Sequence, residues 1–382
     1  MQARTITRIA DIPAADWNRL VLAASPAGAD LNPALSHDFL LALQESGCAA
    51  EATGWETRFL ALERNGQLVG ALPLYGKAHS WGEFVFDWAW ADAYQRHGLA
   101  YYPKWIAASP FTPATGPRLL AATPEVRTEL LETALAQARE AGVSSLHLLF
   151  PGEAEAREMA ARGMLLRQGV QFHWRNPGYS DFAAYLASLR RDKRKKIQQE
   201  RRRVFDAGIR FRRLAGSDIQ EADWRHFMAC YTHTHRRFNS PPALNLDFFL
   251  RLGATMPEHL LLVVAERNGR PIAGAFNLLN RETVYGRSWG ALEYHPGLHF
   301  ETCYYQAIEF CIERGIATFE GGAQGEHKLA RGFLPVTTWS AHWLAHPEFS
   351  RAVEDFLARE GEGVSRYLDQ LSEHDPYKRS TP

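Results

Sequence analysis

Two stretches of the chain carry the same pattern of apolar and polar residues around an identical tetrapeptide. The sequence ERNG occupies residues 63–66 and recurs at residues 266–269, each time between two apolar runs. An Asn-Gly pair in this setting favours a type I′ hairpin, because both central residues of that turn need positive φ. The pattern therefore predicts two β-hairpins at equivalent places in two parts of the chain.

The similarity extends beyond the hairpins. The stretch FVFDWAW (84–90) aligns with TVYGRSW (283–289), and each closing tryptophan precedes a Gly-Leu pair by eight residues. The two copies lie too far apart along the chain for a solenoid repeat, so the repeat indicates a duplicated domain. We predict an N-terminal domain over residues 1–178, a connector over 179–207 and a C-terminal domain over 208–382.

The second copy is the more regular one. Its pattern predicts strands over 259–266, 271–279 and 283–291, a helix over 301–315 that stops at Gly315, and a strand over 316–322. A helical crossover makes the last strand parallel to the third. Three antiparallel strands, a crossover helix and a parallel strand form the core layout of a GNAT domain.

The first copy repeats this layout less regularly. Its strands are predicted near 57–63, 67–75 and 83–90, followed by a helix over 124–142 and a strand over 143–150. The segment 101–120 holds four prolines, which block a helix interior, so we expect an irregular loop there. The fold class is therefore α/β (α+β), with two GNAT-like domains whose mixed, mostly antiparallel sheets are flanked by helices.

Composition excludes several classes of protein. The formal net charge is zero and 46% of the residues are hydrophobic, so the whole chain carries no field that selects nucleic acid or anionic membrane. Four scattered cysteines form no metal or disulfide pattern. His233 and His235 lack a third ligand, so no metal site is predicted. Without a signal peptide or spanning segment, we expect a cytoplasmic protein, with a peripheral contact at the inner membrane left open.

A basic helix separates the two copies. Residues 190–203, RRDKRKKIQQERRR, hold nine basic and two acidic residues in a composition that favours helix. Two interpretations remain: a solvated linker face, or an arm that binds the phosphates of RNA or of a pyrophosphate headgroup. The predicted phosphate-binding residues are Lys193, Lys195, Lys196, Arg201 and Arg202.

Several stretches resemble one bacterial family. YYPKWIAASPFTPATGPRLL (101–120), YGRSWGALEYHPGLHFETCYYQ (285–306) and FEGGAQGEHKLARGFLP (319–335) are similar to the FemAB-like predicted N-acyltransferases of the GNAT superfamily, which carry a peptidoglycan-biosynthesis label. These are distantly similar to the Fem aminoacyl-tRNA-dependent peptidyltransferases. The resemblance implies an acyltransferase or aminoacyltransferase whose partners are tRNA and an amine-bearing small molecule, peptide or cell-envelope precursor.

The donor is the least determined part of this expectation. Acetyl-CoA-using GNAT enzymes carry a glycine-rich loop before the helix, whose amides hold the pyrophosphate. Here that loop reads LEYHPGLHFE, with the single glycine Gly297. This departure favours aminoacyl-tRNA as the donor, leaves acyl-CoA open, and implies no tightly bound cofactor.

The densest set of reactive side chains follows the last strand of the second copy. Amide formation needs a base, a polarised carbonyl and a proton for the leaving group. Glu320 ends the strand, and Glu326 and His327 are the candidate bases beyond it. Gln324, Lys328 and Arg331 are expected to contact substrate. The alternative for this segment is a solvated turn.

The start of the 301–315 helix supplies further candidates. Glu301 is either a helix-capping carboxylate or a catalytic one, and Tyr304 is a candidate acid. His299 is expected to contact the donor. Arg287 is a cation on a buried strand and needs an anionic partner, which is either Glu301 or Glu320 or a carboxylate or phosphate of the substrate. In the first copy, Arg118 resembles part of a Fem substrate-binding loop.

Two other functions remain as alternatives. One is an acyl-CoA-dependent GNAT N-acetyltransferase. The other is a non-catalytic module that binds RNA or a lipid headgroup on a GNAT pair.

Overall fold

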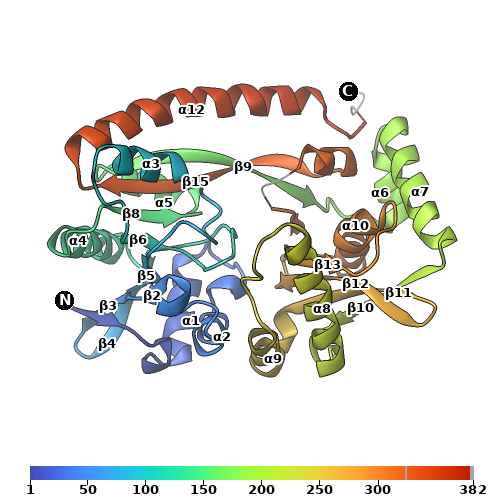
Figure 1. The fold of residues 1–382 in the computed structure, drawn as a ribbon, viewed down its shortest axis with the longest axis horizontal. Coiled ribbons are helices and arrows are strands. Elements are labelled where there is room, and N and C mark those ends of the chain that lie inside the picture. Colours follow the sequence, from blue (N-terminus) through green and yellow to red (C-terminus); the bar gives the residue numbers. More distant parts are fainter. Residues whose placement is uncertain (323–324, 379–382) are drawn as a thin grey trace. The chain divides into compact units, whose positions relative to one another are not determined.

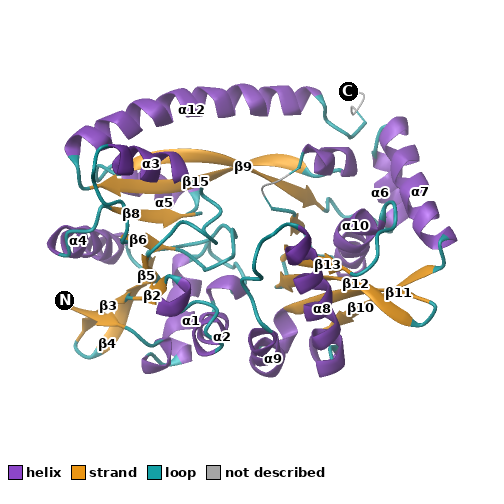
Figure 2. Cartoon of the chain, in the orientation of Figure 1, coloured by secondary structure: helices purple, strands orange, loops and turns teal. Residues whose placement is uncertain are grey.

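In the computed structural model, residues 1–322 and 325–378 are described, and they form two compact units (Figure 1). Helices and strands are mixed in both units (Figure 2). The first unit holds Met1–Gly169 and Thr337–Arg366, and the second holds Val170–Val336 and the residues from Tyr367 onward.

Neither unit is a continuous piece of the chain. The boundaries fall within strand β9 (Leu165–Arg175) and strand β15 (Leu334–Leu344), and again within the long helix α12 (Pro347–Glu373). The observed units therefore differ from the sequential division at 178 and 208 that the sequence suggests. The segment 179–207, expected as a connector, lies inside the second unit.

The first unit contains two groups of strands. One is an antiparallel sheet in the order β1–β3–β4–β7: Gln2–Ile6, Phe59–Arg64, Gln67–Leu72 and Leu120–Ala121. The other runs β2–β5–β6–β8 and then the C-terminal residues of β15; its first four strands are Trp55–Thr57, Leu74–Lys77, Lys104–Ala107 and Ser145–Leu149. In this second group β6 and β8 are parallel and the other pairs are antiparallel.

Helix α4 (Pro124–Glu140) shows why the sequence folds this way locally. Thr123 caps it through the backbone amide of Val126, and Pro124 occupies a first-turn position that needs no N–H. Leu130, Leu131 and Ala134 fall on one face and are buried against the strands. The other helices that begin in this unit are α1 (Ala14–Ala24), α2 (His37–Glu45), α3 (Trp88–Arg96), α5 (Glu153–Ala160) and the long helix α12.

The second unit is built on a single run of strands. The order is β10–β11–β12–β13–β14, followed by the C-terminal residues of β9: Ile209–Ala215, Leu260–Arg267, Arg270–Leu279, Thr283–Ala291 and Thr318–Glu320. The pair β13 and β14 is parallel, and the remaining pairs are antiparallel. Its helices are α6 (Phe182–Ser188), α7 (Arg191–Asp206), α8 (Glu221–Arg237), α9 (Leu246–Thr255), α10 (Leu298–Phe300) and α11 (Gln306–Arg314).

The structure confirms the two predicted hairpins and the predicted second-copy strands. Asn65 and Gly66 have φ of 53° and 74°, and Asn268 and Gly269 have φ of 51° and 72°, as a type I′ turn requires. The predicted helix is also present, but it begins at Leu298 and contains a π-helical turn over Glu301–Tyr305.

The predicted strand over 83–90 is wrong. These residues form a turn and the start of α3, because Glu83 and Asp87 point inward to Lys104 and not along a sheet face. The parallel partner of β8 is β6, which lies inside the segment 101–120 that was expected to be an irregular loop. The first-unit counterpart of β13 is therefore β6, four residues in a stretch where prolines hide the strand pattern.

Among the residues that the structure describes, we find no helix long and apolar enough to cross a membrane.

Candidate functional site

A cavity opens in the second unit where β13 and β14 separate. The two strands pair only from Thr283 to Tyr285 and from Thr318 to Glu320, and β13 then continues to Ala291 without this partner. A register shift between Phe276 and Asn277 bends the neighbouring strand β12. The cavity of about 110 Å³ lies at this opening, and the lining residues that carry reactive or polar groups are Asn277, Arg287, Ser288, His299, Cys303 and Tyr304.

The side chains at the start of the crossover helix point in two directions. Gly297, with φ of 89°, allows the chain to turn into α10, and the π-helical turn follows directly. His299, Cys303 and Tyr304 line the cavity. Glu301 and Tyr305 instead contact side chains of α7, so the two sets of residues have different surroundings.

The aromatic and imidazole rings of this region pack against one another. The Tyr304 hydroxyl lies 3.3 Å from Nε2 of His327, on the segment that follows β14. The rings of His299 and His327 have centroids 6.3 Å apart, and Phe300 contacts both His299 and His327. The arrangement therefore places two imidazoles and a phenol beside one cavity.

Burial sets the protonation states in the cavity. It lowers the pKa of His299 to about 4, with further lowering by the charges of His327, Arg331 and Lys328, so this imidazole is neutral near pH 7. Burial also lowers the pKa of Lys328 to about 8; its ammonium group donates to the carbonyl of Gly322 at 3.1 Å. A neutral imidazole is the form that accepts a proton.

Arg287 and Glu320 lie near each other at one edge of the site. Burial raises the pKa of Glu320 to about 8, against the opposing charges of Arg175 and Arg287. Burial lowers the pKa of Arg287 to about 10, against Tyr231 and Glu320. Arg287 lines the cavity, whereas Glu320 lies beside it without being part of its lining.

Helix α7 has an inward face and an outward face. Ile197, Glu200, Arg201 and Val204 point inward at helical spacing. Arg201 pairs with Glu301 and Glu309, each at 3.1 Å, and Glu200 pairs with the buried Arg331 at 2.7 Å and accepts from Tyr305. The outward face exposes the basic residues Arg191, Lys195, Lys196, Arg202 and Arg203.

A sequence profile of one family covers nearly the whole chain. The FemAB-like profile, described as peptidoglycan biosynthesis/recognition, matches residues 8–379. This chain belongs to the FemAB-like family. No curated protein matches the sequence of this FemAB-like protein.

Solved structures share the fold of this FemAB-like protein at low sequence identity. FemX is 11% identical with a TM-score of 0.54, and the match covers 93% of this chain and 100% of that one. The C-terminal domain of a putative lysylphosphatidylglycerol synthetase from Agrobacterium fabrum is 10% identical, with a TM-score of 0.54 and coverages of 90% and 95%. L-PGS from Bacillus licheniformis is 9% identical, with a TM-score of 0.52 and coverages of 87% and 99%. The predicted fold class, mixed α/β with two sheets, is confirmed, and FemX shares this fold.

The structure of the FemAB-like protein brings together several residues expected at the site. Arg287, His299 and Tyr304 line the cavity, and His327 contacts two of them through its ring. Lys328 lies close enough for its charge to lower the pKa of His299. Gln324 lies outside the described residues, and the side chain of Glu326 is not described.

Other expected residues lie elsewhere. The carboxylate of Glu301 accepts from Arg201 and Gln306, so it binds α7 and does not line the cavity. Lys193 is half-buried and pairs with Asp192 at 3.1 Å. Arg118 belongs to the first unit, where its buried guanidinium donates to the carbonyls of Ala114 and Gly116.

Sequence reasoning missed Cys303 and Glu200. The signal for Cys303 was available in part: it stands four residues after His299, the spacing of one helical face, but the predicted helix began at residue 301 and left His299 outside it. The signal for Glu200 was also available, as one of two acids in a strongly basic helix. An acid retained among nine basic residues at an inward helical position indicates a buried partner.

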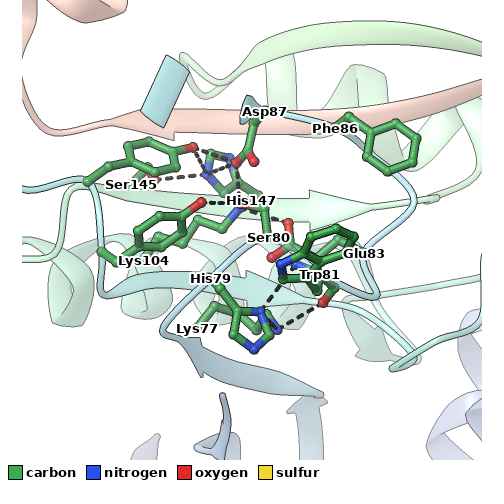
Figure 3. A network of polar contacts seen from close by, with 12 residues as sticks. Lys77, His79, Ser80, Trp81, Glu83, Phe86, Asp87, Lys104, Ser145 and His147 are labelled. Atoms are coloured by element: carbon green, nitrogen blue, oxygen red, sulfur yellow. Dashed lines mark hydrogen bonds and ion pairs between the residues drawn. The ribbon is translucent and has the colours of Figure 1, made fainter. Parts of the chain in front are cut away.

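The first unit holds a different polar cluster, shown in Figure 3. Lys104 is fully buried and donates to Glu83 at 2.7 Å, to Ser80 at 2.8 Å and to Asp87. His147 and His342 contact each other through their Nδ1 atoms at 2.8 Å. Around this cluster the usual pattern is reversed, because the polar Ser80, Glu83 and Asp87 are buried while four aromatic residues of the same loop, Trp81, Phe84, Phe86 and Trp88, are exposed.

Proposed function

We propose that the protein transfers an acyl or aminoacyl group to an amine, and that the chemistry takes place in the cavity of the second unit. The single observation that carries this proposal is the convergence of a neutral imidazole, a guanidinium and a phenol on one opening between diverging parallel strands. Each of these groups matches a requirement of acyl transfer: a base for the amine, positive charge at the carbonyl oxygen and a proton for the leaving group.

Each of these residues has a separate role in the proposed reaction. His299 accepts the proton that the amine loses as it attacks the carbonyl, since its imidazole is neutral. Arg287 provides positive charge at the carbonyl oxygen or at an anionic part of the donor. Burial raises the pKa of Tyr304, so its hydroxyl keeps a proton that it can supply to the leaving oxygen, with His327 as its hydrogen-bond partner.

The outward face of α7 supports aminoacyl-tRNA as the donor. Lys196 on this face is close enough to His327 for its charge to lower the pKa of that imidazole. A phosphate backbone bound by Lys195, Lys196 and Arg202 would therefore lie close to the cavity. One structural relative is named a lysylphosphatidylglycerol synthetase, a name that contains an aminoacyl group.

The contact between α7 and Gly297 argues against the acyl-CoA alternative. A Cβ atom at Gly297 would lie 3.2 Å from the carbonyl oxygen of Glu200 and 3.3 Å from the side chain of Val204. The backbone at the start of α10 is thus covered by α7, at the place where GNAT enzymes hold the CoA pyrophosphate. The single glycine of this loop and its packing against α7 therefore both disfavour acyl-CoA as the donor.

The proposed acceptor is an amine on a cell-envelope precursor. The family description, peptidoglycan biosynthesis/recognition, supports this class of acceptor. Such precursors are made in the cytoplasm or at the inner face of the membrane, which is where we propose that the protein acts.

A transfer assay tests the proposal and separates it from its alternatives. Purified protein is mixed with a pool of tRNA charged with labelled amino acids, or with labelled acetyl-CoA, and with a peptide that carries a free lysine amine. We expect label on the peptide only with charged tRNA. Label from acetyl-CoA alone would support the N-acetyltransferase alternative, and binding of tRNA without transfer would support a non-catalytic module.

A further inference from the structure

The second unit contains two Cys–His pairs with the same helical spacing. On α8, His226 precedes Cys230 by four residues, and Nε2 lies 3.2 Å from Sγ. At the front of the crossover helix, His299 precedes Cys303 by four residues, and Nδ1 lies 3.8 Å from Sγ. Both cysteines are free thiols. The two pairs hold the same side chains at the same spacing, although a different ring nitrogen faces the sulfur in each, so they can be compared for the effect of their surroundings.

The surroundings differ in access. Cys303 and His299 both line the cavity, together with Arg287 and Tyr304. Cys230 is fully buried where α8 packs on β13: a Cβ atom added to Gly290 would come within 2.3 Å of the Cys230 backbone. Of the four cysteines, all of which lie in the described part of the chain, Cys303 is the one that is not fully buried.

At rest both groups of this pair are uncharged, because burial disfavours the thiolate and the imidazolium alike. Burial raises the pKa of Cys303, and the charge of Lys328 opposes this rise, so the resting pair is a neutral thiol beside a neutral imidazole. His299 can then take the thiol proton as sulfur attacks a carbonyl. The ammonium group of Lys328 lies near enough to stabilise negative charge on sulfur as it develops.

We propose that Cys303 is a catalytic nucleophile that carries the acyl group as a thioester between donor and acceptor, a step that rests on the proposed transferase function. In the first half-reaction Sγ bonds to the carbonyl carbon and the bond from that carbon to the donor oxygen breaks. His299 takes the thiol proton, Tyr304 supplies a proton to the leaving oxygen, and His299 then returns its proton to Tyr304. In the second half-reaction the amine nitrogen bonds to the carbonyl carbon and the C–S bond breaks. His299 moves the amine proton to Sγ, which restores the thiol and releases the amide.

Trapping the acyl-enzyme tests this step. The full-length protein is treated with p-nitrophenyl acetate, an activated acetyl ester, in the absence of amine, and is then examined by intact-mass and peptide mass spectrometry. We expect one acetyl group on Cys303, and we expect glycinamide to remove it as the N-acetyl amide. Cys303→Ala should not be acetylated, and Cys303→Ser should be acetylated more slowly at the same position. His299→Gln should slow acetylation by about 100-fold or more.

The buried pair supplies the matched control. Cys230→Ala and His226→Gln should be acetylated at the rate of the parent protein. Acetylation of Cys230 or of surface lysines, with Cys303 unmodified, would overturn the proposal. Transfer from charged tRNA to amine by Cys303→Ala at an undiminished rate would also overturn it, while leaving the transferase function intact. Acetylation of Cys303 in a protein that transfers nothing from charged tRNA would support the nucleophile and remove the proposed donor.

Discussion

The two units of this FemAB-like protein each hold a polar cluster, and the two clusters differ in how they are covered. In the first unit, Lys104 is fully buried and its ammonium group is surrounded by Ser80, Glu83 and Asp87. In the second unit, Arg287, His299 and Cys303 line a cavity. Both clusters adjoin the parallel strand pair of a GNAT-like core, β6 with β8 and β13 with β14. The comparison teaches that the same core can close completely around its polar groups in one place and leave them lining a cavity in another.

The largest expected effect follows from breaking the closed cluster of the first unit. Lys104→Met leaves Glu83 and Asp87 buried without their cation, which we expect to lower the free energy of unfolding by about 3–5 kcal/mol. Urea denaturation measures this change. Arg96→Met, which removes an exposed pair with Asp92 on α3, should cost less than about 1 kcal/mol. An equal effect of the two substitutions would show that the cluster does not stabilise the fold.

The second effect concerns the open cavity. His299→Gln removes the proposed proton acceptor, so the rate of amine acylation should fall by about 100-fold or more while the unfolding midpoint stays close to that of the parent protein. His295→Gln is the matched control, because His295 pairs with Glu293 in the same segment and does not line the cavity. A large loss of stability in His299→Gln would assign this histidine to packing instead.

The third effect is a pH dependence of stability that belongs to the first unit. Burial lowers the pKa of Lys77 to about 7, although its ordinary value is 10.5. Between these values the unfolded chain holds a proton that the folded protein has released, so stability rises with pH in this window. In Lys77→Met this contribution is absent. The rise in unfolding free energy from pH 7.5 to 9.5 should therefore be smaller in the variant, by up to about 2 kcal/mol.

Urea titrations at the two pH values measure the difference. Lys195→Met, which changes an exposed lysine on α7, serves as the control and should follow the parent protein. Parallel curves for Lys77→Met and the parent would contradict the assignment of this pH dependence to Lys77.

The smallest effect per residue concerns the exposed basic face of α7. Replacing Lys195, Lys196 and Arg202 with Gln should weaken tRNA binding and reduce the slope of log affinity against log salt by about 1 for each phosphate that is no longer neutralised. Arg225→Gln, Arg270→Gln and Arg314→Gln change three exposed basic residues on other elements and should leave the slope unchanged. A parent protein whose tRNA affinity does not depend on salt would remove this surface from the site.

The sequence predicted the second unit well because its elements are regular. Asn268-Gly269 marks its hairpin, and Gly315 ends its helix with φ of 66°. The first unit was harder, because the strand β6 has only four residues and the tryptophans and phenylalanines of residues 81–88 imitate a strand pattern. The false strand pattern arises because Glu83 and Asp87 point inward to Lys104. This partner is distant in sequence, so periodicity does not reveal the contact.

The candidate site was predictable in part. The position of His299 and Tyr304 at the mouth of the cavity follows from the crossover-helix pattern, which the sequence shows. The direction of Glu301 does not follow, because the π-helical turn changes which side chains share a face. Glu301 therefore binds Arg201, and the acid expected for catalysis serves to hold α7.

The discontinuity of the units has a consequence for how the chain acquires its structure during synthesis. The first unit includes Thr337–Arg366, and the C-terminal residues of β15 pair with β8 from Ser340 to Leu344. Until these residues leave the ribosome, β8 has an unpaired edge whose amide and carbonyl groups invite intermolecular pairing. Folding of the N-terminal half must therefore wait for the last part of the polypeptide, and a fragment ending near residue 178 would be prone to aggregate.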